Sequence, residues 1–406
     1  MTSVVFVAPF FAETTLRFVQ ATADLPGVRL GLVSQDPDSK LPPVLRAKLA
    51  AHYQVDDALD AGKLVSAVQH LGTRIGPATR ILGTLEELQV PLAEVRQYLR
   101  VDGLSVEAAK NFRDKSRMKT VLAAAGLPCA RHRLVATTQE AWDFVQAVGY
   151  PIVVKPPAGA GSRNTFRING AEQLHDVLAM SKFSAEKPAL FEEFIVGQEQ
   201  SFDSVLIHGH PVWCSINHYY PGPLEVLENP WIQWAVLLPR EADAPEYEDI
   251  RRVAYRSLEV LGMKTGLTHM EWFRRKDGTV AVSEVAARPP GAQFTTLISY
   301  AHDFDLYRGW AHLMVYDEFP APERKYAAGA AYLRGQGEGK VIAVHGLDKV
   351  RQELGDLVVE AKLPKPGQSP TGTYEGEGYV ILRHPETKVV QDGLKKLITT
   401  IRVELG

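Results

Sequence analysis

The sequence predicts a multidomain protein that combines α/β and α+β architecture, and three observations support this fold class. The chain has 406 residues, enough for two or three domains of ordinary size. Short apolar runs alternate with helical stretches over the first hundred residues, as in a parallel α/β layer. Strand-rich sequence then runs from residue 189 to residue 288, and a mixed, Gly-rich block begins at about Lys325. Because no long flexible spacer separates these parts, we expect lobes that share clefts.

The composition is that of an ordinary soluble globular protein. Hydrophobic residues make up 45% of the chain, charged residues 23%, and the formal net charge is −3. This balance gives no general attraction to nucleic acid or to an anionic membrane. Cys129 and Cys214 are the only cysteines, so neither a disulfide framework nor a cysteine metal site is indicated, and a cytoplasmic location fits. The apolar start lacks a basic segment and is broken by Pro9, which favours a first strand over a signal peptide. No apolar run approaches the roughly 18 residues of a membrane span.

The N-terminal third should contain two strands and several helices. We expect strands over residues 3–9 and 28–35, with a helix over 12–25 between them. No Gly-x-Gly-x-x-Gly fingerprint of dinucleotide-binding proteins follows the first strand. Helical sequence continues over 86–99 and then, as one stretch, over 105–126.

The second helical stretch has clear end signals. Ser105 is a good N-cap, and Gly126 with Pro128 is a stop signal. The other expected elements are a helix over 137–149, a strand over 150–157, a helix near 245–262, a strand over 379–384 and a terminal helix over 389–405.

The stretch YPIVVKPPAGAGSRN, residues 150–164, places a lysine at the end of an apolar strand. The ammonium of Lys155 can pair with phosphate oxygens, while the amides of residues 159–163 can donate hydrogen bonds with little side-chain obstruction. The loop lacks the spacing of a P-loop. The alternative is a lysine that extends to solvent before an ordinary surface turn, and this stretch alone leaves both interpretations open.

Other charged residues favour a nucleotide site. Lys115 and Lys119 lie one helical turn apart, on one face. Glu192 and Glu193 interrupt an apolar strand, and Glu199 follows shortly after. Charged residues are rare inside strands unless they are exposed or have a partner. The exocyclic amine of a base and a ribose hydroxyl are suitable partners.

A hairpin near residue 277 gives the strongest signal. A two-residue Asp277-Gly278 turn would place Glu271 directly opposite Glu284, where two carboxylates repel each other unless a cation lies between them. Their hard oxygen atoms suit Mg²⁺. By the two-residue period of a strand, Ala286 and Arg288 share the face of Glu284, so one ribbon would present two metal ligands and a guanidinium to phosphate. The alternative is a pair of solvated surface glutamates.

From about residue 105 to 315 the chain resembles the ATP-grasp superfamily, specifically its biotin-carboxylase-like carboxylate–amine ligases, which include the L-amino acid ligases. The resemblance rests on the order of five motifs: Asp-Lys at 114–115, GYPIVVKP…GAGS, FEEFIVGQE, HMEW and SEVAARPPG. It implies an ATP-grasp fold with three domains. These are an N-terminal Rossmann-like α/β domain over 1–105, an ATP-grasp domain over 106–315 with a lid at about 120–188, and a small mixed α/β domain over 316–406.

The resemblance also implies a role for each matching residue. For the nucleotide, it assigns Lys115 and Lys155 to the ATP phosphates, Gly161 and Ser162 to the loop that covers them, Glu192 to the adenine amino group, the backbone of Glu193 and Ile195 to the base, and Glu199 to the ribose. For metal and substrate, it assigns Glu271 and Glu284 to Mg²⁺, Arg288 to the phosphorylated substrate, and Gly291 to the substrate region.

The implied activity is ATP-dependent ligation of a small carboxylate, such as an amino acid, to an amine through an acyl phosphate, with release of ADP and phosphate. ATP and Mg²⁺ are the expected cofactors, and assembly as a homodimer is left open. Two alternatives remain: an enzyme of the same fold that activates bicarbonate, as carboxylases do, or transfers phosphate directly, and a nucleotide-binding protein that has lost catalysis. The second draws on Ala286, since the family usually has an asparagine there to hold a second metal.

His269 would face Ala286 across the same ribbon. We hypothesise that His269 partly fills the space of the missing asparagine, near the second metal or substrate. Imidazole suits Mn²⁺ better than Mg²⁺, so Mn²⁺ is an alternative metal. The competing interpretation is that His269 packs beside Phe273 or binds a neighbouring backbone group.

Overall fold

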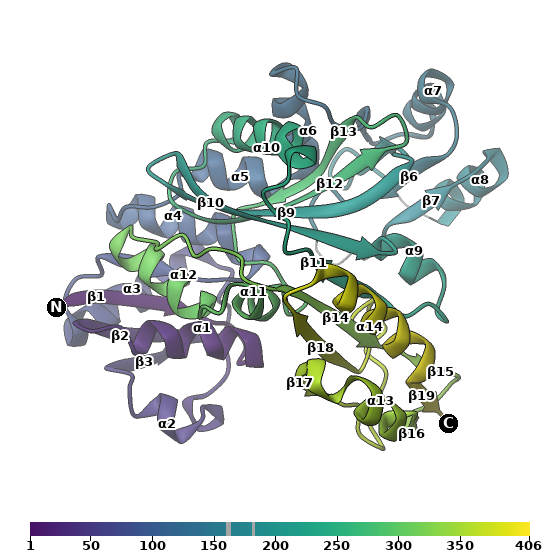
Figure 1. The fold of residues 1–406 in the computed structure, drawn as a ribbon. Coiled ribbons are helices and arrows are strands. Elements are labelled where there is room, and N and C mark those ends of the chain that lie inside the picture. The colour runs from purple at the N-terminus through teal and green to yellow at the C-terminus, as the bar shows by residue number, and fades with distance from the viewer. Residues whose placement is uncertain (160–163, 181–182) are drawn as a thin grey trace.

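A computed structural model describes residues 1–159, 164–180 and 183–406 of the chain. The described elements form four β-sheets with helices packed against them (Figure 1). Among the described residues, none of the helices combines the length and apolar character needed to cross a membrane.

The N-terminal sheet is parallel, with strand order β3-β2-β1-β4 and helices on both faces. Its elements are β1 (Thr2–Val7), α1 (Glu13–Ala23), β2 (Val28–Ser34), α2 (Pro43–Arg46), β3 (Ala51–Gln54), α3 (Ala61–Ile75), β4 (Arg80–Leu82) and α4 (Gln89–Leu99). Alternate residues of β1 enter different cores: Val4 and Phe6 pack with α1, whereas Val5 and Val7 pack with α3. This alternation is the consequence of the two-residue period of a strand. The two expected strands and the helix between them are confirmed.

The helical stretch over 105–126 is two helices rather than the single one expected. α5 (Val106–Arg113) begins after Ser105, whose side chain accepts a hydrogen bond from the amide of Ala108, so the expected cap is confirmed. Asp114 then adopts an extended conformation and caps α6 (Lys115–Ala124) through its own carboxylate. An aspartate competes with the helical backbone for amide hydrogens and so favours a helix start over a helix interior.

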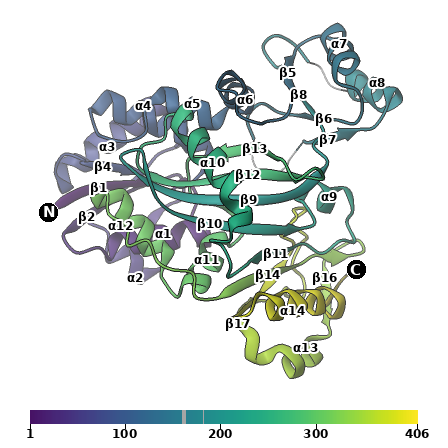
Figure 2. The same cartoon turned by 45° about the horizontal axis from the view of Figure 1, so that its top comes forward.

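A small antiparallel sheet, order β5-β8-β6-β7, follows. Its elements are β5 (His132–Val135), α7 (Thr138–Val148), β6 (Ile152–Lys155), β7 (Phe166–Ile168), α8 (Ala171–Met180) and β8 (Ala189–Glu193). Phe144 of α7 and Phe191 of β8 belong to its core. In Figure 2 this sheet and its two helices stand apart from the long central sheet. β6 delivers Lys155 to the space between them, because it is the last residue of that strand.

The central sheet has eight strands in the order β13-β12-β9-β10-β11-β14-β18-β17. Its first part comprises β9 (Gly197–Ile207), β10 (His210–Tyr220), α9 (Pro223–Glu228), β11 (Ala235–Leu238), α10 (Glu248–Leu261), β12 (Gly266–Arg275), β13 (Val280–Ala286), α11 (Phe294–His302) and α12 (Leu306–Tyr316). Helix α10 packs on one face of this sheet, against Met270 and Trp272 of β12. Helices α11 and α12 belong to the core on the other face.

The C-terminal part completes that sheet and adds a three-stranded one, order β15-β19-β16. Its elements are β14 (Ala327–Leu333), β15 (Gly335–Gln336), β16 (Val341–His345), α13 (Leu347–Leu354), β17 (Val358–Lys362), β18 (Gly378–His384), α14 (Thr387–Thr400) and β19 (Arg402–Leu405). The terminal helix expected over 389–405 was therefore too long. Residues 402–405 form β19 instead, where Val403 is buried against the α14 core.

The hairpin that joins β12 and β13 does not have the expected two-residue Asp277-Gly278 turn. The amide of Arg275 donates to the carbonyl of Thr279 at 2.8 Å, so residues 276–278 form a three-residue loop. Gly278 has φ +85°, as the last position of such a loop requires.

A β-bulge compensates for the longer loop. Ser283 is inserted between the pairs that join β12 to β13, and it restores the register. Glu271 therefore faces Glu284, and His269 faces Ala286, as the sequence predicted. The expected pairing is confirmed although the expected turn was wrong.

Candidate functional site

A cavity of about 890 Å³ lies where the N-terminal sheet, the small sheet and the central sheet meet. The predicted site residues that the structure describes all line it: Lys115, Lys155, Glu192, Glu193, Ile195, Glu199, His269, Glu271, Glu284, Arg288 and Gly291. Gly161 and Ser162 lie outside the described residues. The topology thus brings together side chains that are up to 176 positions apart, from Lys115 to Gly291.

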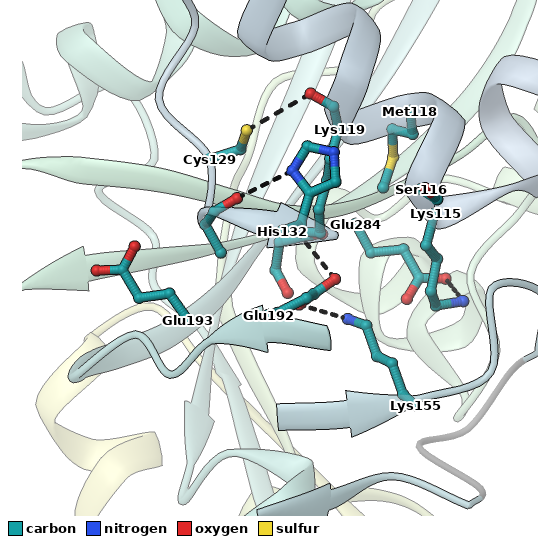
Figure 3. Close-up of polar contacts among 12 residues, drawn as sticks. Lys115, Ser116, Met118, Lys119, Cys129, His132, Lys155, Glu192, Glu193 and Glu284 are labelled. Atoms are coloured by element: carbon teal, nitrogen blue, oxygen red, sulfur yellow. Dashed lines mark hydrogen bonds and ion pairs between the residues drawn. The ribbon is translucent and has the colours of Figure 1, made fainter. Parts of the chain in front are cut away.

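Two lysines share one glutamate at the centre of the site (Figure 3). Lys155 Nζ lies 2.9 Å from Glu192 Oε2, and Lys119 Nζ lies 3.5 Å from Glu192 Oε1. Lys119 also donates to the carbonyl oxygen of Ser283 at 2.7 Å, a group that the β-bulge presents. All three charged side chains are buried, with Lys119 at 0% exposure.

The pKa values in this cluster depend on two opposing effects: burial disfavours each charged form, and the opposite charges nearby favour it. Burial by itself would raise the pKa of Glu192, but the charges of Lys119 and Lys155 outweigh it and hold that pKa below its usual value. For Lys155, burial is outweighed by Glu192 and Glu284, and its pKa is raised. For Lys119, burial prevails and the pKa is lowered. Lys119 is therefore the one of the two ammonium groups that burial destabilises most.

Lys115 pairs with the second hairpin glutamate. Its Nζ lies 2.8 Å from Glu284 Oε1 and donates to the carbonyl of Gly159 at 3.0 Å. Burial would raise the pKa of Glu284, but Lys115 and Lys155 lower it to about 2. Glu284 is therefore a carboxylate at any physiological pH.

The two hairpin glutamates are suited to a hard cation. Their carboxylates come from facing positions of β12 and β13, and oxygen donors are the ligands that Mg²⁺ prefers. Across the described part of the chain, no group of three or more His, Cys, Asp or Glu side chains is arranged to hold a metal ion. A site with two carboxylates fits Mg²⁺, because this ion typically takes one or two carboxylates and completes its shell with water and substrate phosphates.

His269 is fixed by a buried aspartate. Its Nδ1 lies 2.6 Å from Asp203 Oδ1, and its Nε2 lies 3.8 Å from Glu271 Oε1. Burial would lower the pKa of His269, but Asp203 and Glu271 together raise it to about 9. A protonated ring has no free lone pair for a metal. The arrangement supports His269 as a positive neighbour of Glu271 on the cavity wall.

Arg288 lies beyond the end of β13 and reaches the N-terminal sheet. Its Nε donates to Glu86 Oε2 at 2.6 Å, and Glu86 is 7% exposed. Its Nη1 donates to the carbonyl of Pro289 at 2.8 Å. Gly291 follows in the loop that leads to α11, and the amide of Phe294 at the helix start donates to the carbonyl of Gly291. Arg288 thus joins two lobes at the cavity.

Glu199 is a half-buried glutamate packed against the turn before α9. A Cβ atom on Gly222 would collide with Glu199 Oε2, so a larger residue there would displace this carboxylate. Burial first, and then the charge of Glu271, raise the pKa of Glu199 well above its usual value. Such a carboxyl gains from a partner that donates hydrogen bonds.

Several site residues were not assigned from the sequence. Lys119 was noted one turn beyond Lys115, but nothing distinguished it from a surface lysine. The sequence offered no signal for Glu86, Asp203 and Glu375, because their importance depends on contacts between distant segments.

The ATP-grasp domain family model matches residues 120–302. An L-arginine-specific L-amino acid ligase of Bacillus subtilis is 26% identical over 269 residues, which is 65% of this chain and 64% of that protein. A D-alanine–D-alanine ligase of Geobacillus kaustophilus is 28% identical over 227 residues, which is 52% of this chain and 56% of that protein. The matches thus span less than two thirds of these relatives.

The structural match covers more of the chain than the sequence matches do. The crystal structure of an L-amino acid ligase from Bacillus licheniformis superimposes with a TM-score of 0.80 at 17% identity, and the match covers 100% of this chain and 99% of that chain. The ATP-grasp fold with mixed α/β sheets that the sequence predicted is confirmed. Residues 120–302 thus match the ATP-grasp domain, and the chain as a whole has the fold of an L-amino acid ligase of known structure.

Proposed function

We propose that this protein is an ATP-dependent, ADP-forming ligase that joins an amino acid or another small carboxylate to an amine. The observation that carries the proposal is one cavity in which three buried lysines, two facing glutamates and Arg288 converge. A field of this kind suits phosphoryl transfer, where the protein mainly positions and neutralises charge. Relatives named as an arginine-specific amino acid ligase and a D-alanine–D-alanine ligase support the same reaction class.

The lysines would bind the phosphates by exchanging partners. Lys155 and Lys115 are each paired with a carboxylate, Glu192 and Glu284 respectively, so phosphate oxygens can replace those partners without leaving a buried ammonium group unpaired. Glu192 Oε1 is buried and, among the described residues, accepts no hydrogen bond. Lys119 Nζ lies 3.5 Å from this oxygen, too far for a short hydrogen bond, so Oε1 can still accept one from the amino group of adenine, whereas guanine would present a carbonyl oxygen there.

Glu271 and Glu284 would hold Mg²⁺ together with phosphate oxygens. When bound, the ion neutralises negative charge on the phosphoryl group that is transferred. The positive ring of His269 beside Glu271 would keep that carboxylate oriented toward the cavity.

Arg288 would hold the substrate carboxylate next to the phosphates. In the first step a carboxylate oxygen bonds to the γ-phosphorus and the bond to ADP breaks. In the second step the amine nitrogen bonds to the acyl carbon, phosphate leaves, and the nitrogen loses a proton. The planar guanidinium of Arg288 can contact both the carboxylate and the new phosphate, and its bond to Glu86 fixes its direction.

The test is a screen of amino acids for ATP-dependent ADP release, with hydroxylamine as a general amine that traps an acyl phosphate as a hydroxamate. The parent protein should form hydroxamate with at least one amino acid, and Lys155→Ala should abolish this while the protein remains folded. Lys187→Ala, at an exposed lysine of the same lobe, is the control and should keep full activity. A parent protein that releases no ADP with any carboxylate, or needs bicarbonate, would contradict the proposal.

A further inference from the structure

A loop from the C-terminal part of the chain closes one side of the cavity. Thr373, Tyr374 and Glu375, between β17 and β18, belong to the cavity lining. They face the same space as Arg288 and the hairpin glutamates, although nothing in the sequence connects them with the nucleotide motifs.

The loop is held in one conformation. Glu377 is 6% exposed, and its carboxylate accepts hydrogen bonds from the amide of Gly335 at 2.6 Å and of Thr371 at 3.0 Å. The hydroxyl of Thr371 donates to the carbonyl of Gly376 at 3.1 Å. Gly376 has φ +60°, and a Cβ atom there would lie 2.5 Å from the carbonyl oxygen of Leu333. Tyr374 and Glu375 are therefore presented by a built loop.

Aromatic rings form the wall next to this loop. Tyr374 meets the ring of Trp234 edge-on, with centroids 4.6 Å apart, and Trp234 stacks on Tyr332 at 4.7 Å. Trp234 also lies beside Tyr219 and Phe294, and all but Tyr332 of these rings line the cavity. The hydroxyl of Tyr332 donates to the carbonyl of Ala292. This contact ties the aromatic wall to the segment that follows Arg288.

Glu375, like Glu199 on another wall of the cavity, lacks a charged partner among the described residues. Glu86, Glu192 and Glu284 each pair with an arginine or lysine, and Glu271 lies beside His269. In the described part of the chain, Glu375 has neither an ion pair nor a side-chain hydrogen bond. Burial raises its pKa. Glu375 is half-buried, and a carboxylate partly withdrawn from water gains stability from a cationic partner, which favours a ligand as that partner.

We propose that Glu375, together with the aromatic wall of Tyr374 and Trp234, binds a cationic nitrogen of the organic substrate. An ammonium or guanidinium group would pair with the carboxylate and lie against ring faces, which attract cations. Arg288 on the same cavity would take the negative end. The substrate is therefore an amino acid held by both of its charges, and this inference rests on the proposed ligase function.

The cationic nitrogen can come from two parts of an amino acid: the α-ammonium group, or the side chain of a basic amino acid. Three probes separate these sources. L-arginine carries both cations, L-norleucine carries only the α-ammonium group, and 5-guanidinopentanoate carries only the side-chain cation.

The experiment measures binding and turnover of the three probes by the parent protein and by Glu375→Gln. Calorimetry with MgADP present gives the Kd, and hydroxamate formation gives KM and kcat. Loss of a hydrogen bond to a charged group typically weakens binding by roughly 10- to 100-fold. We expect Kd and KM for the recognised probes to rise by about that factor in Glu375→Gln, while the KM for ATP stays within twofold. Glu375→Asp should recover part of the loss, and Glu338→Gln, an exposed carboxylate of the same region, should change nothing.

The experiment distinguishes failure of the cation site from failure of the proposed ligase function. An effect on L-norleucine but not on 5-guanidinopentanoate assigns the α-ammonium group, and the reverse assigns the side chain. Binding that weakens in Glu375→Gln without any turnover in the parent supports the cation site and refutes the ligase. Unchanged affinity for all three probes, no binding of any probe by the parent, or an equal rise in the KM for ATP overturns the inference.

Discussion

The charge balance of Lys119, Lys155 and Glu192 can be tested by removing its members one at a time. Lys119→Met removes a charged hydrogen bond to Ser283, whose usual contribution is about 1.5–3 kcal/mol. Glu192 keeps Lys155 at 2.9 Å in that variant, so no carboxylate is left alone. We expect a destabilisation near that range.

Glu192→Gln should cost more. It leaves two buried ammonium groups, at 0% and 9% exposure, without the carboxylate that they share. Breaking a buried ion pair from one side typically costs about 3–5 kcal/mol. The double variant Glu192→Gln/Lys119→Met should lose less than the sum of the single variants, because the second change removes the repulsion that the first one creates.

The assay is thermal unfolding of the nucleotide-free protein at pH 7, and the order of Tm values decides the result. Glu193→Gln is the matched control, since the neighbouring Glu193 pairs with Arg131, which is 58% exposed, and surface pairs contribute about 0–1 kcal/mol. If Glu192→Gln unfolds at the same temperature as Glu193→Gln, the two lysines are not both charged in the folded protein. The reasoning would then be refuted, and burial would have neutralised Lys119.

Two further predictions concern other buried groups. Burial lowers the pKa of His302 to about 3. As the pH falls below about 6.5, this histidine takes up a proton in the unfolded chain but not in the folded one. The free energy of unfolding should therefore fall by up to about 2 kcal/mol between pH 7 and pH 5. His302→Leu should flatten the dependence of Tm on pH in this window. The control is His210→Leu, which replaces an exposed histidine. If Tm falls as steeply with pH in His302→Leu as in the control, the prediction is contradicted. Gly376→Ala should lower Tm more than Gly372→Ala. Both glycines have positive φ, but only a Cβ atom at residue 376 would lie 2.5 Å from the carbonyl oxygen of Leu333. Equal losses of Tm would show that the positive φ alone, which costs about 1–2 kcal/mol, sets the destabilisation.

The sequence could predict those parts of the fold and site that depend on local pattern. The parallel first layer, the cap at Ser105 and the position of Lys155 at the end of a strand follow from periodicity and from residue type. The site residues on β6, β8, β12 and β13 follow because each stands at a fixed position in a strand with a recognisable motif.

The remaining features depend on contacts that a local pattern does not contain. Glu86 matters because Arg288, 202 positions away, donates to it. Glu375 matters because its loop folds back over a cavity built by other lobes. The extra residues of the terminal helix were misassigned because residues 402–405 pair with β15 and β16, and strand pairing overrides helical propensity.

The bulge at Ser283 keeps the two glutamates facing each other in this chain, but a hairpin without Ser283 would pair them as well. If Ser283 were deleted, Trp272 would still face Val282 and Glu271 would still face Glu284, now in a regular ladder. The glutamate pairing alone therefore does not explain why the chain carries the extra residue Ser283. Its carbonyl oxygen accepts the hydrogen bond of Lys119 at 2.7 Å, and that ammonium group is fully buried.

Two single-residue deletions test this explanation. Deletion of Lys276 shortens the exposed loop to Asp277-Gly278, a favoured two-residue turn, and should leave both Tm and ATP affinity close to those of the parent. Deletion of Ser283 keeps the glutamate pair but removes the acceptor of Lys119, so it should lower the stability by about 1–3 kcal/mol, the usual cost of a buried group left unpaired. Adding Lys119→Met to the Ser283 deletion should recover part of that loss, since no buried ammonium group then lacks its acceptor. If both deletions are equally harmless, or if Lys119→Met deepens the loss, the bulge does not serve Lys119.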